Sequence, residues 1–205
     1  RCRGVDAEVT QNGFRTRGVL KDFSAVALAV AVGSAQTDAF RYFDADSPAT
    51  VHLSREGELI LSASCRCIRQ ASEPGGREVV LTPAPGPASR LLTKRFRTPR
   101  VAVTPSPVIT FEHPLTRKKI QMDVKNLSCS GFAVSLMPED DVLMTRMVIP
   151  EITIHVAGAV KIRCKAQVLN RRVEKNQHIR YGFVLLDMDI ETYNRLSHIV
   201  LNAID

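Results

Sequence analysis

The chain has 205 residues and a mass of 22.7 kDa, enough for one large domain or two domains of roughly 100 residues each. With 44% hydrophobic and 24% charged residues, its composition is that of a globular protein and excludes a disordered or fibrous chain. The formal net charge of +7 favours an anionic partner, which leaves nucleic acid, a nucleotide and an anionic membrane surface open.

The first part of the chain has an all-β pattern. Short apolar runs at residues 26–32, 58–63 and 78–81 alternate with turn-forming pairs such as Asn12-Gly13. Residues 82–90 then contain three prolines, which cannot donate the hydrogen bonds of a strand ladder. We therefore expect a first domain at residues 1–81 and a linker at residues 82–93.

The second part, residues 94–205, repeats this pattern and ends differently. Apolar runs predict six strands in about a hundred residues, which indicates a small barrel; they cover residues 101–103, 120–124, 132–136, 151–156, 160–168 and 181–186. In the tail, apolar residues recur at helical spacing: Ile190, Tyr193, Leu196, Ile199, Val200 and Ile204. This spacing predicts a terminal amphipathic helix packed on the barrel.

An internal repeat relates the two parts. Residues 21–30, KDFSAVALAV, match residues 125–134, KNLSCSGFAV, in the pattern Lys-[Asp/Asn]-x-Ser-x-x-[Ala/Gly]-x-Ala-Val. The match agrees with the position of the linker. The predicted fold is therefore mainly β, with two related small barrels in tandem.

The cysteines and apolar runs bear on location. Five cysteines, an odd number, are scattered along the chain, which is unlike a disulfide-stapled secreted domain, so we expect a reducing, cytoplasmic environment. Cys65 and Cys67 would share one face of a strand, and no second Cys or His pair completes a zinc site, so we expect two core or surface thiols and no metal.

No apolar stretch approaches the roughly 18–20 residues that span a bilayer. Because the chain starts with Arg1, we expect it to be part of a longer protein.

One motif carries most of the functional information. Asn126-x-Ser128-x-x-Gly131 precedes an apolar strand and follows a basic run at residues 94–100, KRFRTPR. On its own the motif is typical of an ordinary turn, because these residue types favour turns for local reasons. Together with the basic run and the closing segment 181–187, YGFVLLD, it resembles the PilZ family over residues 94–205. The resemblance implies binding of cyclic di-GMP by the second domain, and a degenerate PilZ-like first domain without a ligand site.

The chemistry of the ligand explains the residue types. Cyclic di-GMP offers two phosphates and two guanines, which the planar fork of an arginine can bind in pairs of hydrogen bonds. The family has two arginines separated by three residues; here Phe96 occupies the first position if Arg100 is the second. We predict Arg95 and Arg100 as the pair, with Arg97 as the substitute for Arg95. The resemblance adds Asn126, Ser128 and Gly131 as ligand-binding residues.

Three other functions are less well supported by the sequence. A ligand-blind PilZ-like adaptor that contacts an unidentified protein partner is the first alternative, and the altered arginine spacing supports it. A nucleic-acid-binding barrel ranks lower, because aromatic residues make up only 5% of the chain and do not interleave with the basic ones. An enzyme ranks last, since no catalytic motif is present and no cofactor is implied. Arg171 and Arg172 are expected in a hairpin turn, where a supplementary phosphate contact is the weaker interpretation.

Overall fold

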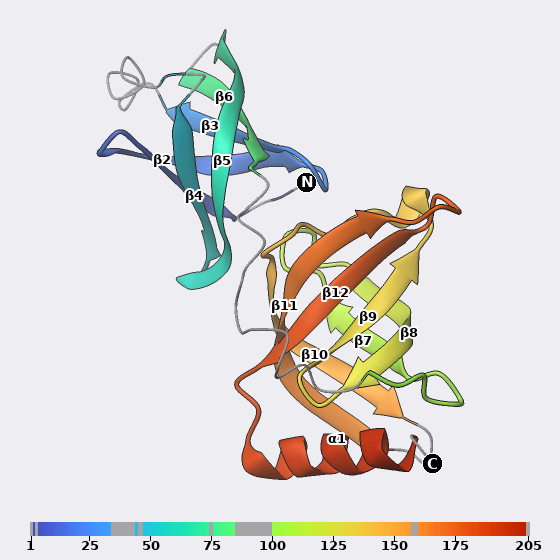
Figure 1. The fold of residues 1–205 in the computed structure, drawn as a ribbon. Coiled ribbons are helices and arrows are strands. Elements are labelled where there is room, and N and C mark those ends of the chain that lie inside the picture. The colour runs from blue at the N-terminus through green and yellow to red at the C-terminus, as the bar shows by residue number, and fades with distance from the viewer. Residues whose placement is uncertain are drawn as a thin grey trace. The chain divides into compact units, whose positions relative to one another are not determined.

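The computed structural model, drawn in Figure 1, describes residues 2, 4–33, 44, 47–73, 76–84, 100–156 and 160–203. The chain divides into two compact units, Arg1–Arg90 and Leu91–Asp205. Each unit contains a closed antiparallel barrel of six strands. The predicted fold class, two small barrels in tandem with one C-terminal helix, is confirmed. The greater part of the predicted linker, together with Arg95 and Arg97, lies outside the described residues.

The two barrels have the same topology. In each, the strands follow one another around the barrel in the order first, second, third, sixth, fifth, fourth. The strands of the first barrel are β1 (Asp6–Gln11), β2 (Phe14–Phe23), β3 (Leu28–Gly33), β4 (Pro48–Arg55), β5 (Glu58–Glu73) and β6 (Gly76–Pro83). Those of the second are β7 (Val108–Glu112), β8 (Lys119–Ser128), β9 (Gly131–Leu136), β10 (Val148–Val156), β11 (Val160–Val173) and β12 (Ile179–Leu186).

The internal repeat is also a repeat of local irregularities. The register shifts in β2 between Leu20 and Asp22, and at the matching place in β8 between Val124 and Asn126. A second matching pair of shifts occurs in β5 and β11, between Cys67 and Arg69 and between Val168 and Asn170. A β-bulge re-aims the side chains that follow it, so corresponding residues face the same way in the two barrels.

Alternating apolar side chains fill each barrel. In the second barrel, Phe132 of β9 and Phe183 of β12 are cross-strand partners whose rings stack with centroids 4.5 Å apart. Tyr181 and Val134 form the next pair inside the barrel, and all four are fully buried. In the first barrel, Cys65 and Cys67 are both buried on one face of β5, as their spacing predicted.

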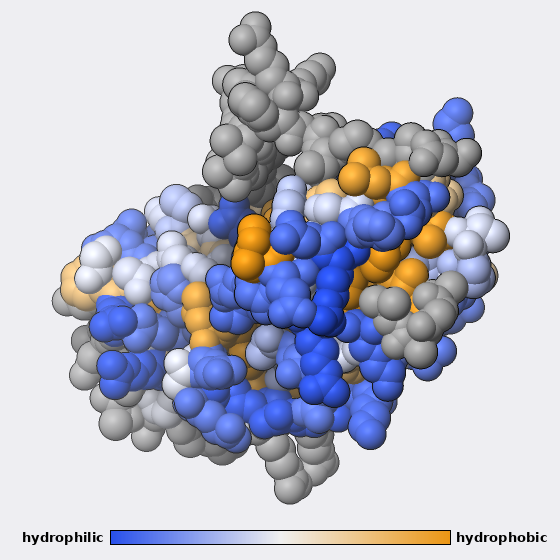
Figure 2. Space-filling view, turned by 90° about the horizontal axis from the view of Figure 1, so that it is seen from below, coloured by the Kyte–Doolittle hydropathy of each residue, from blue (hydrophilic) through white to orange (hydrophobic). Residues whose placement is uncertain are grey.

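One α-helix follows the second barrel. Helix α1 (Ile190–Asn202) begins after Asp189, whose side chain accepts a hydrogen bond of 2.6 Å from the backbone N–H of Thr192. It packs against β8 and β11 and buries Leu196 and Val200, which confirms the predicted amphipathic helix. Of the helices that the structure describes, none has the length and apolar character to cross a membrane. The face in Figure 2 is mainly hydrophilic, with hydrophobic side chains in separate patches.

The structure corrects two local predictions. Residues 101–103, predicted as a strand, form only a single bridge between Val101 and Leu127. Pro105 and Pro107 follow closely, and neither can donate a ladder hydrogen bond. Arg171 and Arg172, expected in a turn, belong to β11, which continues to Val173. Four strands were not predicted, namely β1, β2, β4 and β7.

Candidate ligand-binding site

The predicted motif forms the tight hairpin between β8 and β9. Ser128 ends β8 and Gly131 begins β9, so only two residues make the turn. The Ser128 hydroxyl donates a hydrogen bond of 2.9 Å to the carbonyl oxygen of Gly131, and Ser128 is 1% exposed. Ser128 therefore holds the hairpin closed.

Gly131 is required by the packing of two strands. A Cβ atom at this position would lie 2.1 Å from the carbonyl oxygen of Phe183 in β12, a distance that backbone atoms cannot tolerate. The glycine thus allows β9 and β12 to pair closely at the base of the hairpin. Its position brings β12 beside the motif.

Asn126 has a hydrogen-bond acceptor that no described residue uses. It follows the bulge in β8, and its side-chain oxygen Oδ1 is buried without a hydrogen-bond partner among the described residues. Leaving a buried acceptor unsatisfied costs about 1–3 kcal/mol, so such groups are rare and often mark a functional position. Asn126 offers this oxygen to a donor from outside the described chain.

Arg100 is brought beside the motif by backbone pairing. The N–H of Val101 donates to the carbonyl of Leu127, and the N–H of Leu127 donates to the carbonyl of Val101, each over 2.9 Å. Leu127 lies between Asn126 and Ser128, so the bridge joins the basic segment to the motif strand. Of the three predicted arginines, Arg100 is the one among the described residues; its side chain is exposed.

A row of aligned residues crosses the outside of the barrel from the motif. Asn126 in β8 pairs with Ala133 in β9, which pairs with Gly182 in β12, which pairs with Asn170 in β11. The two middle positions, Ala133 and Gly182, carry little or no side chain. The surface between the two asparagines is therefore a shallow depression, which we call the floor of the row. A Cβ at Gly182 would lie 2.8 Å from Oδ1 of Asn170, which shows that the Asn170 side chain lies over this glycine.

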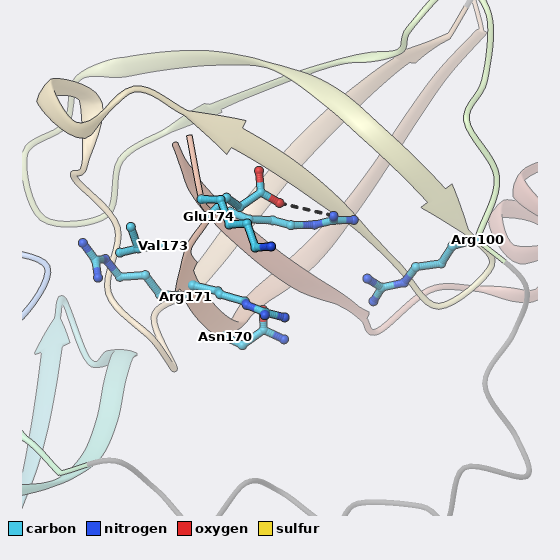
Figure 3. Close-up of a pocket in the computed structure, with 8 residues that line it drawn as sticks. Arg100, Asn170, Arg171, Val173 and Glu174 are labelled. Carbon is cyan, nitrogen blue, oxygen red and sulfur yellow. Dashed lines mark hydrogen bonds and ion pairs between the residues drawn. The ribbon is translucent and has the colours of Figure 1, made fainter. Parts of the chain in front are cut away.

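A hollow of about 930 Å³ opens at the far end of this row (Figure 3). Its lining comes from the segment before the barrel and from the β11–β12 hairpin: Arg100, Asn170, Arg171, Arg172, Val173, Glu174, Lys175 and Arg180. Five of these described residues are cationic and one is acidic, so the hollow suits an anionic ligand. Figure 3 shows Arg100 extending toward the residues of the hairpin.

The sequence predicted only part of this lining. Arg100 lines the hollow, whereas Asn126, Ser128 and Gly131 belong to the neighbouring hairpin and not to the lining. Asn170, Arg172 and Arg180 were not predicted as site residues. The available signal was the pair of arginines that flanks the β11–β12 turn.

Arg171 has a structural partner. Its Nε donates to Oδ1 of Asp141 over 3.1 Å, and its second nitrogen forms an ion pair with the other carboxylate oxygen. The hydroxyl of Tyr181 also bonds Asp141 and lies 2.9 Å from the carbonyl oxygen of Leu143. Burial and the bond to Asp141 raise the pKa of Tyr181, while the hydrogen bond to Asp141 raises the pKa of Arg171. This network ties Arg171 of β11 and Tyr181 of β12 to the segment of Asp141 and Leu143.

The first barrel has the same row of positions with different side chains. Asp22, Ala29, Val80 and Arg69 are aligned there as Asn126, Ala133, Gly182 and Asn170 are in the second barrel. Val80 thus replaces the glycine of the floor with a branched side chain. At the hairpin, Ser24 accepts a hydrogen bond of 3.1 Å from the N–H of Ala27, which stands where the second barrel has Gly131.

Among solved structures, the chain is similar to YcgR from Escherichia coli in complex with c-di-GMP (15% identity, TM-score 0.46), over 97% of this chain and 83% of that one. It is similar to the K. pneumonia MrkH–c-di-GMP complex (12%, 0.48), over 98% and 88% of the two chains, and to the Bacillus subtilis inhibitor of motility MotI (13%, 0.46), over 97% and 94%. No curated protein sequence matches. The model of the PilZ domain matches residues 94–202, more than half of the chain, and the chain therefore belongs to the PilZ domain family.

Proposed function

We propose that the second unit binds cyclic di-GMP and that the chain is an effector of this nucleotide and not an enzyme. Membership of the PilZ family supports the choice of ligand. The observation that carries the proposal is the buried Oδ1 of Asn126, which has no hydrogen-bond partner among the described residues. It lies beside the backbone bridge that holds Arg100, which lines the cationic hollow.

The ligand and these groups are chemically complementary. Guanine carries an amino group that can donate a hydrogen bond to the Asn126 oxygen. Its O6 and N7 atoms can accept hydrogen bonds from the paired donors of an arginine such as Arg100. The phosphates suit the cations of the hollow. In this proposal Arg95 or Arg97 supplies the second arginine, while Ser128 and Gly131 set the shape of the wall.

The output signal of binding would come from the arginine-containing segment, residues 94–100. A ligand shifts a conformational equilibrium only if it binds one state better than the other. Arginines in the segment that leads into the second barrel would provide this difference, because they would contact the ligand only when that segment is wrapped around it. Ordering of the segment would then change the orientation of the two units and present them to a protein partner in motility, attachment or polysaccharide control.

A ligand-blind adaptor is the second candidate, and one observation favours it. The Ser128 hydroxyl is already hydrogen-bonded within its own hairpin, and Gly131 is explained by the packing of β9 on β12. Both motif residues therefore have structural reasons to be present without a ligand. This candidate predicts that the chain contacts its partner equally well with and without cyclic di-GMP.

Isothermal titration of the full chain with cyclic di-GMP separates the two candidates, with GTP and cyclic di-AMP as control ligands. We expect saturable binding of cyclic di-GMP alone. Arg100→Ala and Asn126→Ala should each weaken it about tenfold or more, because each removes a hydrogen-bonding partner of a charged or buried group. Arg163→Ala, an exposed arginine of β11 outside the hollow, is the matched control and should bind normally. No heat at high micromolar ligand would favour the adaptor.

A further inference from the structure

Two arginines face each other across the β11–β12 hairpin. Arg172 and Arg180 are direct cross-strand partners, so their side chains leave the same face of the sheet. The neighbour Tyr181 points into the core, so this face is the outer one. Like charges directly opposite one another destabilise a strand pair by about 0.2–1 kcal/mol. Such an unfavourable pair of charges is typical of a position that serves function and not stability.

Among the described residues, an anionic side chain pairs with one of the two arginines. Arg180 lies 3.5 Å from a carboxylate oxygen of Glu174, an ion pair marked in Figure 3. Within the described part of the chain, Arg172 has no carboxylate at ion-pair distance. Arg171 differs from both, since it points the other way and is held by both oxygens of Asp141. Arg172 and Arg180, the outer pair, thus form a cationic site whose charge Glu174 neutralises only in part.

The outer pair lies next to the row that starts at the motif. Arg172 and Arg180 are each two residues from Asn170 and Gly182 along their strands, which is about 7 Å. They line the same hollow as Arg100. A ligand whose base occupies the row would therefore carry a phosphate within reach of both guanidinium groups.

We propose that Arg172 and Arg180 form the phosphate-binding subsite of this hollow, and that Glu174 is a competing anion which the phosphate replaces. The inference rests on the proposed function, that the hollow takes cyclic di-GMP. A phosphate between the two arginines relieves their repulsion and gives each an anionic partner. Glu174 opposes binding twice, because its carboxylate repels the phosphate and because its ion pair with Arg180 must break.

The test is isothermal titration of full-length variants with cyclic di-GMP. Arg172→Ala and Arg180→Ala should each weaken binding about tenfold or more, because each removes a charged hydrogen-bond donor to the phosphate. Glu174→Gln should tighten it about threefold or more, as expected from removing one partly exposed ion pair. In the Arg180→Ala background the Glu174→Gln change should have a smaller effect, because the contribution of the broken ion pair is absent and only the repulsion of the phosphate remains.

The matched control is Glu112→Gln, which removes a carboxylate that pairs with Arg117 over 2.8 Å elsewhere on the same barrel. It should leave the affinity unchanged, and thermal melts should show that all variants fold. If the wild type binds but Glu174→Gln binds no better, or if either alanine variant binds normally, the inference fails while the proposed function stands. If the wild type does not bind, both fail.

Discussion

Val101 and Leu127 are joined by two backbone hydrogen bonds of 2.9 Å each, one in each direction. Among the described residues, Val101 makes only this isolated bridge and belongs to no strand. It is nevertheless what brings the segment of Arg100 to the strand of Asn126. The geometry of the candidate site therefore depends on a pairing that is much smaller than the barrel that supports it.

Replacing Val101 with proline should loosen this attachment without unfolding the barrel. Proline has no N–H, so the bond to the Leu127 carbonyl is lost. A hydrogen bond of this kind contributes about 1 kcal/mol, and we expect cyclic di-GMP to bind about fivefold more weakly by titration calorimetry. Val103→Pro, in the same segment but without a ladder partner in the described chain, is the control. Equal losses in both variants would show that the bridge is not what positions Arg100.

Two glycines of the second barrel should respond differently to alanine. Gly131→Ala places a methyl group against the backbone oxygen of Phe183, so we expect a loss of about 1–3 kcal/mol in the free energy of unfolding by urea. Gly182→Ala meets the Asn170 side chain, which can rotate away, so stability should change by less than about 1 kcal/mol. The added methyl group would, however, fill space between Ala133 and Asn170, so the binding of cyclic di-GMP should weaken. A stability loss as large as that of Gly131→Ala would contradict this distinction.

Helix α1 should stabilise the second barrel through its buried face. Leu196 is fully buried and Leu201 is 61% exposed. We expect Leu196→Ala to lower the free energy of unfolding by about 2–5 kcal/mol because it leaves a cavity, and Leu201→Ala to change it by no more than about 0.5 kcal/mol. Urea unfolding followed by circular dichroism measures both. Similar effects at the two positions would mean that the helix is not docked through Leu196.

Cys164 should make stability depend on alkaline pH. Burial raises the pKa of its thiol to about 11 from an ordinary value of 9.0. Because the folded pKa is the higher one, the stabilisation is fully present below about pH 9 and is lost as the pH rises toward 11. The free energy of unfolding should therefore fall between pH 9 and 11, and less steeply in Cys164→Ala. Parallel pH profiles for the two proteins would refute this role of the thiol.

Local patterns were sufficient to predict much of the fold. The turn residues between apolar runs indicated two β-domains, the spacing of Leu196 and Val200 indicated the helix, and the match of residues 21–30 with 125–134 indicated the repeat. These features depend on residues close together in the sequence. The motif at Asn126 was recognisable for the same reason, since its hairpin closes within six residues.

The rest of the site depends on pairing between distant strands. Asn126 and Asn170 share a row only because four strands are in a particular register, with a bulge in each of the outer two. The pairing of Arg172 with Arg180 was missed because the predicted strands ended at residue 168 and resumed at residue 181, and Arg172 was assigned to a turn. Once the strand continues to Val173, the same residues become partners across a hairpin. A bulge shifts the register by one residue, and no local pattern in the sequence indicated it.

The bond between Arg171 and Asp141 has a consequence for how binding would respond to ionic strength. Arg171 pairs with Asp141, and Arg180 pairs with Glu174. In the proposed subsite Arg171 would keep its carboxylate when a ligand binds, whereas Arg180 would give up Glu174 to take a phosphate. The first contributes no new ion pair and the second exchanges one for another. Salt screens only the attractions that are gained, so affinity would fall with added salt less steeply than five cationic side chains suggest. Binding in the hollow would therefore exchange an internal ion pair, that of Arg180 with Glu174, for an ion pair with the phosphate of the ligand.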